Sequence, residues 1–451
     1  MSAEQPPEAV PVAVIGSDLG AVATAARLAR LGHRTTLLSE EEVLVPEGRG
    51  IALSTWPGDL GPAPMVDDLP LTTAFPAPWR DLFKKTGMPL EGSLAKAELA
   101  LSPAPATRHR FSDGSELVLP NDRSTRQVIL RRRYGAAAAQ RWETLLRQLT
   151  DVWQRQRALG LEQELTSNDQ IRRAALPGGS IAGLARSIKE PHLAAVIRST
   201  AWLEGNDPRL TPGFRATPLA LAAVFGEWMV THHDQPVRFG HVVDALLDRL
   251  AVRGVEILAP AAVLDLSRTV AGRWRITTAT GEVEVAAATL ATDLWQQAEL
   301  TGAAVPALRR ARGLRRAIAP RVQHWWQESP LDEPEHVMEH HRDGIVESWR
   351  RAYAGGTLVT EHVRRRGGPD ATVAAWRRGS HHWLRRPPIR LDASLTTVSA
   401  SGRGGGSPQQ VLLAAALASY ALHEELTGED VRPTNKTPPP RRPQALPRWD
   451  R

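Results

Sequence analysis

The chain has 451 residues, of which 42% are hydrophobic and 23% charged, and this globular composition excludes a wholly disordered or fibrous protein. It contains no cysteine, which excludes disulfides, thiolate zinc sites, iron–sulfur clusters and a cysteine nucleophile. The 56 basic and 49 acidic residues leave a net charge of only +7, and the arginine runs at 131–133 and 364–366 are not interleaved with aromatic residues. We therefore predict no nucleic acid partner.

The N-terminus and the most apolar stretches bear on where the protein resides. Residues 1–8 lack the basic segment and following apolar segment of a secretory signal. The stretches 219–225 and 411–422 are the most apolar, and both are shorter than the roughly 20 residues that a membrane span requires. We therefore expect a cytoplasmic protein, with peripheral association at a membrane surface left open.

The first pattern along the chain is that of a βαβ unit. Residues 10–15 form a short apolar run, as in a buried parallel strand, and a turn follows at 16–20. Residues 21–31 are rich in alanine and place apolar residues on a helical period, and Gly32 ends the helix. A second strand is predicted at 35–38. Such a unit predicts a right-handed crossover and a parallel sheet, as in dinucleotide-binding folds.

The rest of the chain alternates between helical and α/β patterning. Residues 78–234 are mostly helical, and near Gly240 a helix–strand pattern returns and leads into a strand meander. A final strand, glycine-rich turn and helix occupy 395–426. These features predict an α/β protein in which a discontinuous dinucleotide-binding domain carries an inserted, mixed α+β domain. We assign the dinucleotide-binding domain to residues 8–77, 239–299 and 389–428, the inserted, in its first part mainly helical, substrate domain to 78–238 and 300–388, and a disordered Pro/Arg-rich tail to 429–451.

The turn after the first strand occupies the position of the G-x-G-x-x-G motif that binds a dinucleotide pyrophosphate. Gly16 supplies the first glycine, which permits the tight turn, and Ala21 is a mild replacement for the third. Asp18 replaces the second glycine, where the backbone approaches the phosphates. A carboxylate about 5 Å from a phosphate, at an effective dielectric of about 20, costs about 3 kcal/mol, or about a hundredfold in affinity. Asp18 can also cap its own helix and satisfy the amides that a phosphate would use.

The end of the second strand lacks the acidic residue that usually holds the ribose of the dinucleotide. Ser39 occupies that position, and Glu40 follows one residue later. Because successive strand residues point to opposite faces, Glu40 is expected to lie on the other side. Two of the features that hold a dinucleotide are thus altered in this chain.

Several motifs, in this order along the chain, resemble those of bacterial phytoene desaturase-like flavoproteins of the flavin amine oxidase superfamily. Residues 12–38 are similar to that family's V-x-V-x-G-A-G-x-G-G turn followed by L-G-H-x-V-x-V-L-E, and residues 110–117 are similar to its F-x-D-G-x-x-L hairpin. Residues 401–408 are similar to its C-terminal H-P-G-G-G-x-P turn. Further similar segments are 71–83, the helix at 241–253 after Phe239-Gly240, and the strands near 255–263 and 291–293.

The resemblance implies a Rossmann-like FAD/NAD(P)-binding domain, FAD as the cofactor, and dehydrogenation or isomerisation of a hydrophobic small-molecule substrate such as an isoprenoid or polyene. It implies a set of cofactor contacts, which are the pyrophosphate turn at Gly16, Ser17, Asp18, Leu19, Gly20 and Ala21, the ribose position at Ser39 and Glu40, the loop residues Gly48 and Arg49, the adenine contact Val263, and the isoalloxazine contacts Ser401, Gly404, Gly405, Gly406 and Pro408. This chain departs from the family pattern at Asp18, Ser39, Glu47 and Gly402-Arg403. Because these departures cluster at cofactor contacts, they leave FAD binding more open than the fold.

Other constellations in the sequence are weaker. His336, Glu339 and His340 spell the H-x-x-E-H of a zinc peptidase helix, but the segment follows two prolines and is predicted to be a strand. Two histidines four apart on a strand share one face and lie too far apart to chelate one ion, so we interpret the segment as a polar edge strand. We interpret His232-His233-Asp234 and His381-His382 as solvated loop residues, and we predict no metal site.

The sequence leaves three functions in competition. An FAD-dependent oxidoreductase is favoured narrowly, and its catalytic residues cannot be assigned because the flavin carries the chemistry. The alternative is a non-catalytic descendant of the same fold with weak or no FAD binding, acting as a partner or ligand-binding protein, which Asp18 and Ser39 motivate. A metal-dependent hydrolase using His336, Glu339 and His340 is the third. The sequence does not indicate an oligomeric state.

Overall fold

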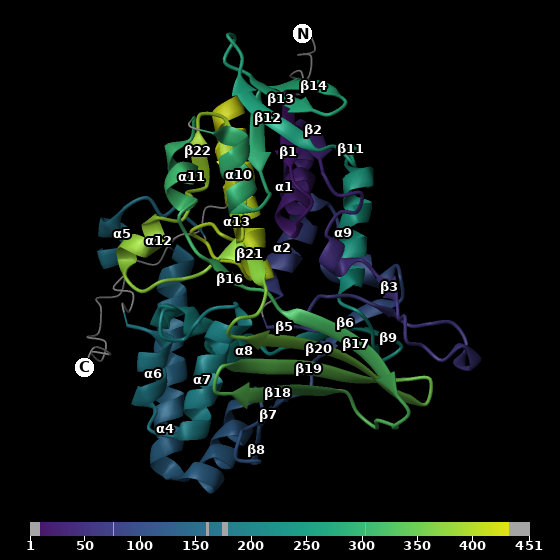
Figure 1. The fold of residues 1–451 in the computed structure, drawn as a ribbon, viewed down its shortest axis with the longest axis vertical. Helices are drawn as coiled ribbons and strands as arrows, with labels where there is room; N and C mark the ends of the chain where they lie inside the picture. Colours follow the sequence, from purple (N-terminus) through teal and green to yellow (C-terminus); the bar gives the residue numbers. More distant parts are fainter. Residues whose placement is uncertain (1–9, 75, 159–161, 174–178, 303, 433–451) are drawn as a thin grey trace, which may run out of the picture.

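The computed structural model describes residues 10–432 except for 75, 159–161, 174–178 and 303 (Figure 1). One half of the molecule is built on a six-stranded sheet in the order β11-β2-β1-β15-β23-β22. All neighbouring pairs are parallel except β22 with β23, which is antiparallel. The strands are β1 (Pro11–Ile15), β2 (Arg34–Leu38), β11 (Glu256–Leu258), β15 (Ala287–Leu290), β22 (Arg390–Asp392) and β23 (Leu395–Thr397). This arrangement confirms the predicted βαβ unit and parallel sheet.

Alternate residues of β1 divide the core of this half into two layers. Val12 and Val14 pack with α1 (Leu19–Arg30), α9 (Gly240–Val252) and α13 (Pro408–Thr427). Ala13 and Ile15 face the other side, where they pack with the meander β12 (Val263–Arg268), β13 (Trp274–Thr278) and β14 (Gly281–Val285) and with α10 (Leu294–Thr301) and α11 (Pro306–Ala311). Burial on both faces explains why β1 is a continuous apolar run rather than an alternating one.

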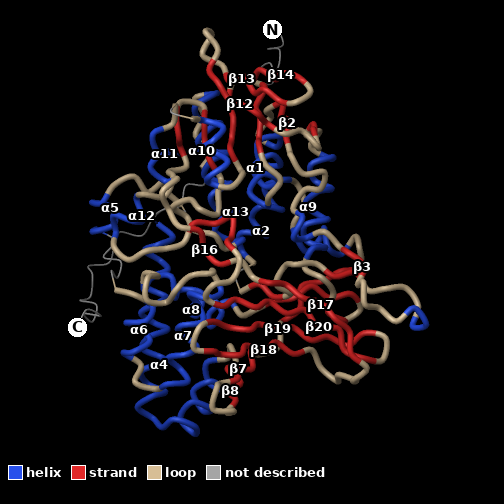
Figure 2. Tube along the Cα trace, in the orientation of Figure 1, coloured by secondary structure: helices blue, strands red, loops and turns tan. Residues whose placement is uncertain are grey.

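The other half of the molecule is a second six-stranded sheet flanked by helices (Figure 2). Its order is β17-β20-β19-β18-β7-β8, antiparallel throughout except for the parallel pair β18 and β7. The strands are β7 (Thr107–Arg110), β8 (Glu116–Leu119), β17 (Arg321–Gln327), β18 (Glu335–His341), β19 (Gly344–Tyr353) and β20 (Gly356–Arg365). The helices are α4 (Arg123–Ala158, broken at Gly135, where φ is 83°), α6 (Ile181–Ser187), α7 (Pro191–Leu203) and α8 (Thr217–Phe225).

Two expectations are settled by this sheet. The prediction that residues 336–340 lie on a strand is confirmed, because they belong to β18. The prediction of an edge strand is wrong, because β18 lies between β19 and β7. Its partner β7 pairs with β18 across more than two hundred residues of chain. Non-local parallel pairing of this kind leaves no local sequence signal.

Shorter elements join the two halves. They are the helices α2 (Ala77–Thr86), α3 (Leu90–Ala95), α5 (Asn168–Arg173) and α12 (Ser380–Leu384), the 3₁₀ turns η1 (Pro46–Gly48), η2 (Gly58–Leu60) and η3 (Gly213–Ala216), and the strands β3 (Ile51–Ala52), β4 (Met65–Val66), β5 (Thr72–Thr73), β6 (Leu99–Pro103), β9 (Trp228–His232), β10 (Gln235–Pro236), β16 (Arg316–Ile318) and β21 (Asp370–Ala374). Within the described ranges, no helix combines the length and apolar character needed to cross a bilayer. Most of the predicted tail, from residue 433 onward, lies outside the described residues.

Candidate functional site

The turn between β1 and α1 requires its first glycine. Gly16 has a φ of +143°, and a Cβ added there would lie 2.1 Å from the carbonyl oxygen of Ala291 at the end of β15. Gly20 allows α1 to approach the core closely, because its Cβ would lie 2.7 Å from the Val398 side chain. These close approaches are the roles expected of the glycines in a dinucleotide-binding turn.

Replacing Gly16 by alanine is expected to destabilise the protein by about 2–3 kcal/mol beyond the cost of the backbone conformation itself, because the added methyl group overlaps a backbone carbonyl. Gly32→Ala is the matched control, since Gly32 also has a positive φ of +91° but has nothing within 4 Å of an added Cβ. Urea unfolding of both variants measures the difference. Equal losses in the two variants would show that the approach to Ala291 is not a constraint.

Asp18 caps helix α1, as the sequence analysis allowed. Its Oδ1 accepts a hydrogen bond of 2.8 Å from the backbone N of Ala21, and the side chain is partly buried. Burial raises the pKa of Asp18 to about 7, the amide of Ala21 opposes this, and the nearby charge of Glu47 adds to the rise. Asp18 therefore occupies amide donors at the helix N-terminus and is partly protonated near neutral pH.

The two residues that follow β2 are both engaged in contacts away from this turn. Ser39 is fully buried, and its hydroxyl donates to the carbonyl oxygen of Glu41 at 2.6 Å. Glu40 is exposed, and its carboxylate accepts a hydrogen bond of 2.9 Å from the side-chain amide of Gln296. The expected opposition of Ser39 and Glu40 is confirmed.

The loop that follows β2 folds back over the glycine turn. The backbone N of Val45 donates to the carbonyl oxygen of Ser17 at 2.6 Å, and Val45 adopts a left-handed conformation with φ of 49°. The carbonyl oxygen of Gly48 accepts from Arg238 Nη1 at 2.9 Å and would lie 2.1 Å from a Cβ at Gly240. Two segments that the sequence analysis treated separately, near 48 and 240, therefore pack directly on each other. Arg49, which follows Gly48, is exposed.

The C-terminal glycine turn is fixed from both sides. Gln410 forms a capping box with Ser407 at the start of α13, and a Cβ at Gly405 would lie 2.4 Å from its Oε1. Ser401 is fully buried, and its hydroxyl oxygen accepts a hydrogen bond of 2.8 Å from the backbone N of Ala374. Arg403 donates to the carbonyl oxygens of Leu165, Leu384 and Arg386. The turn at 401–407 is therefore rigid and presents the N-terminus of α13.

A cavity of about 460 Å³ lies between the two halves of the molecule. The glycine turn after β1 and the C-terminal glycine turn before α13 both reach it. Four of the predicted site residues line it, which are Asp18, Leu19, Gly406 and Pro408. Glu47 lies beside them. The predicted contacts that do not line this cavity are Gly16, Ser17, Gly20, Ala21, Ser39, Glu40, Gly48, Arg49, Val263, Ser401, Gly404 and Gly405. Val263 lies instead at the start of β12 in the meander.

The far wall of the cavity carries a group of polar residues that the sequence analysis did not assemble. We refer to it as the polar array; it comprises Thr107, Glu227, His336, Glu347 and Arg364. Four of them lie on β7, β18, β19 and β20, and Glu227 immediately precedes β9, so sequence spacing could not bring them together. The only signal was the H-x-x-E-H spelling, which pointed to His336 for a different reason. The facing wall is largely apolar and includes Trp142, Leu146, Val196, Leu203 and Leu219 from α4, α7 and α8.

The three residues of the H-x-x-E-H segment do not converge. The His336 Nε2 atom lies 3.0 Å from Glu347 Oε1, whereas His340 Nε2 lies 2.9 Å from Nδ1 of His109. Burial and the charge of Arg198 hold the pKa of His340 low, at about 3. Glu339 lies on the opposite face of β18 and forms an ion pair with Arg110 at 3.7 Å. This arrangement does not support the metal-dependent hydrolase.

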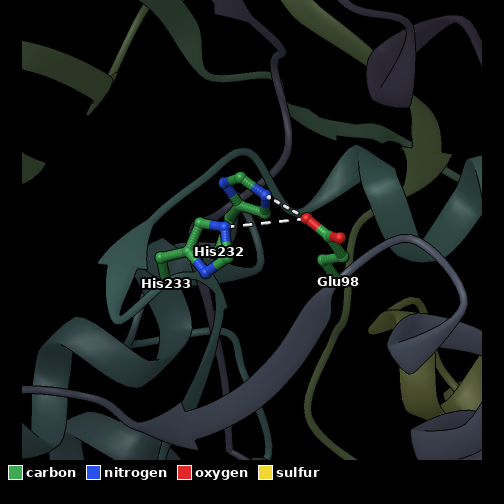
Figure 3. Close-up of side chains that lie close together, drawn as sticks. All are labelled: Glu98, His232 and His233. Carbon is green, nitrogen blue, oxygen red and sulfur yellow. Dashed lines mark ion pairs between the residues drawn. The ribbon is translucent and has the colours of Figure 1, made fainter.

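Within the part of the chain that the structure describes, the one group of three side chains whose ligand atoms lie close enough to share a cation is Glu98, His232 and His233 (Figure 3). Glu98 Oε2 lies 3.5 Å from His232 Nε2 and 3.6 Å from His233 Nε2. The side chains are 72%, 44% and 73% exposed, respectively. This exposure confirms that His232 and His233 are solvated, and surface ion pairs account for the arrangement. The prediction that these histidines lie in loops is wrong for His232, which ends β9, and for His381-His382, which belong to α12.

Comparison with solved structures identifies the fold. The chain matches a mutant of putrescine oxidase with a TM-score of 0.64 and 10% identity, covering 93% of this chain and 99% of that one. It matches cyclohexylamine oxidase from Brevibacterium oxydans IH-35A with a TM-score of 0.61 and 12% identity over 93% and 99% of the two chains. A putative protoporphyrinogen oxidase from Exiguobacterium sp. 255-15 gives a TM-score of 0.55 at 12% identity over 92% and 99%. The chain therefore shares the fold of these oxidases, and the predicted fold class is confirmed.

Comparison of sequences identifies one relative among curated proteins. No family model matches the chain. A hydroxyneurosporene desaturase from Cereibacter sphaeroides is 29% identical over 231 residues, which cover 49% of this chain and 44% of that protein. The match thus spans less than half the length of the relative. Together with the fold, it confirms the resemblance to phytoene desaturase-like flavoproteins of the flavin amine oxidase superfamily.

Proposed function

We propose that the protein is an FAD-dependent oxidoreductase that acts on a hydrophobic small-molecule substrate, of which an isoprenoid or polyene is the first candidate. The observation that carries this proposal is the cavity between the two halves. The glycine turn at Asp18 and the helix N-terminus at Gly406 and Pro408 reach it from one side, and an apolar helical wall faces them. The relatives whose names include desaturase and oxidase support the same chemistry.

The glycines of the turns fit a flavin dinucleotide, because Gly16, Gly20 and Gly405 keep the backbone close to its neighbours without side-chain bulk. The acids Asp18 and Glu47, which lie beside these turns in the cavity, conflict with it. Asp18 is the residue in the pyrophosphate turn itself, and its carboxylate would face the phosphates when ionised. With a pKa of about 7, it is neutral in a substantial fraction of molecules at physiological pH, which reduces the repulsion. FAD can accept a hydride or electrons when bound. The chain itself would orient the substrate and exclude water, through residues such as Trp142 on the apolar wall.

Binding of flavin is the first test. The visible absorption spectrum of freshly purified full-length protein is expected to show a flavin near one equivalent, released on denaturation. Gly406→Val should reduce this content, because Gly406 lines the cavity. The control Gly313→Val should not, because Gly313 is exposed and a Cβ there would meet only one atom, at 3.9 Å. Colourless protein that takes up no FAD in excess would overturn the proposal and favour the non-catalytic descendant.

A further inference from the structure

The polar array forms a continuous chain of contacts across the second six-stranded sheet. Arg364 Nη1 lies 3.7 Å from Glu347 Oε2, and Glu347 Oε1 lies 3.0 Å from His336 Nε2. On its other side, His336 Nδ1 lies 3.1 Å from Thr107 Oγ1, which lies 3.4 Å from Glu227 Oε2. The array therefore begins at Arg364 in β20 and ends at Glu227, immediately before β9.

The hydrogen bonds of the array run from His336 through Thr107 to Glu227. Burial alone would lower the pKa of His336, but the hydrogen bond and charge of Glu347 outweigh it and raise that pKa. When it is protonated, His336 donates from both ring nitrogens, to Glu347 and to Thr107. The hydroxyl of Thr107 is then free to donate to Glu227. Glu227 is consequently the terminal acceptor, and its second carboxylate oxygen accepts no hydrogen bond from any residue that the structure describes.

Exposure decides which end of the array a ligand can reach. His336 and Glu347 are only 3% and 6% exposed, and Arg364 is 8% exposed. All five residues line the cavity, but Glu227 and Thr107 are less deeply buried than the other three. A molecule in the cavity would therefore meet Glu227 and Thr107, while the other three residues fix their position and protonation.

The charges of the array indicate the chemistry of that molecule. Glu347 pairs with the two cations His336 and Arg364, whereas burial raises the pKa of Glu227. An ammonium or carboxylate group on the ligand would bring a further charge into this poorly solvated site. A pure hydrocarbon would desolvate Glu227 without offering it a hydrogen bond, which disfavours its binding. A hydroxyl group adds no charge, donates to Glu227 when that group is ionised and accepts from it when it is protonated.

We propose that the substrate carries a hydroxyl group that hydrogen-bonds to Glu227 and Thr107, while its apolar remainder lies against α4, α7 and α8. This inference rests on the proposed function, since it names the substrate class of the same cavity. It makes Glu227 a specificity-determining residue, and it makes His336 and Glu347 positioning residues that act through Thr107.

A series of probes that share one apolar chain tests this assignment. Isothermal titration calorimetry of the full chain as purified, at pH 8, would compare 1-octanol with its methyl ether, with octanoate and with octylamine. Octanol is expected to bind on the order of tenfold more tightly than the ether, which lacks the donated proton. Glu227→Gln should weaken octanol binding several-fold and leave the ether unchanged, because a neutral amide is a weaker acceptor than a carboxylate.

The matched control is Glu339→Gln, which removes a carboxylate from the face of β18 that is turned away from His336 and should leave all four affinities unchanged. Equal binding of octanol and ether, or tighter binding of either charged probe, would overturn the inference. Flavin content is measured on the same samples. Octanol selectivity without flavin binding would overturn only the proposed oxidoreductase, and flavin binding without octanol selectivity would overturn only this substrate class.

Discussion

Replacing Glu204 by glutamine is expected to destabilise the protein by about 3–5 kcal/mol, because it leaves a buried guanidinium without its counter-charge. Arg215 is 1% exposed and forms a two-point ion pair with Glu204, in which Nε lies 3.0 Å from Oε2. A second buried arginine, Arg386, lies nearby, and burial together with the charge of Arg215 lowers its pKa to about 9. Among the residues that the structure describes, Glu204 is the acid that offsets both of these cations.

Glu204→Gln is also expected to lower flavin affinity, because Arg215 contacts the turn at the cofactor end of the cavity. Arg215 Nη2 also donates to Gln410 Oε1 at 2.9 Å, and Gln410 caps α13 beside Gly405. Loss of the ion pair should therefore loosen the glycine turn and lower flavin affinity as well as stability. Urea unfolding measures the first effect, and flavin titration measures the second.

Two controls make this prediction specific. Glu91→Gln breaks an exposed ion pair with Arg80 of 2.6 Å and should cost less than about 1 kcal/mol. The double replacement Glu204→Leu with Arg215→Met should recover part of the lost free energy of unfolding, because it removes this buried pair but leaves Arg386 without its offsetting acid. A loss in Glu204→Gln no larger than that in Glu91→Gln would show that the buried pair is not a source of stability.

The elements of the dinucleotide-binding half could be predicted because their signals are local. The apolar run at 10–15, the alanine-rich helix after it and the meander at 263–285 each carry their period within one element, and the structure places β1, α1 and β12–β14 there. The helix cap at Asp18 was also accessible, since the capping side chain and the amide it accepts from are three residues apart.

The polar array was not accessible to the same reasoning. Thr107 and His336 meet because β7 and β18 pair in parallel. Glu347 pairs with Met338 in the register of β18 with β19 and reaches His336 as its diagonal neighbour. Neither register has a sequence signature, because β7 and β18 carry polar residues at most positions and no apolar alternation specifies which residues pair. The same lack of a visible partner strand explains why β18 was expected at an edge. Local chemistry could therefore be predicted from this sequence, whereas chemistry assembled across strands required the fold.

Replacing Asp18 by glycine is expected to tighten FAD binding by about a hundredfold at pH 8.5 and only slightly at pH 5.5. An ionised Asp18 about 5 Å from a phosphate costs about 3 kcal/mol, and a protonated one costs little. Because burial raises the pKa of Asp18 to about 7, the wild-type protein should lose affinity as the pH rises through 7. The glycine variant should not, and loss of the cap costs only a few tenths of a kcal/mol when glycine replaces it. Flavin titrations across this range measure both curves.

Asp18→Asn is the matched control, since it keeps an acceptor for the Ala21 amide but removes the charge, and it should share the flat pH profile of the glycine variant. The free energy of unfolding provides a second readout with a defined sign. The folded protein holds a proton on Asp18 between its ordinary pKa of 3.8 and about 7, whereas the unfolded chain has released it. Stability should therefore fall as the pH rises through that window, and Asp18→Asn should remove this component.

Ser39→Glu, which would restore an acid at the ribose position, tests cofactor binding less clearly than Asp18→Gly does. Ser39 is fully buried and donates to the carbonyl oxygen of Glu41, so a glutamate there would overpack the end of β2. The charge at Asp18 is thus the feature of the pyrophosphate turn that one substitution can isolate. If FAD affinity varies with pH in the same way in the wild type and in Asp18→Gly, this carboxyl group does not face the phosphates. The affinity would then depend on the loop at Val45 and Glu47 that covers the turn.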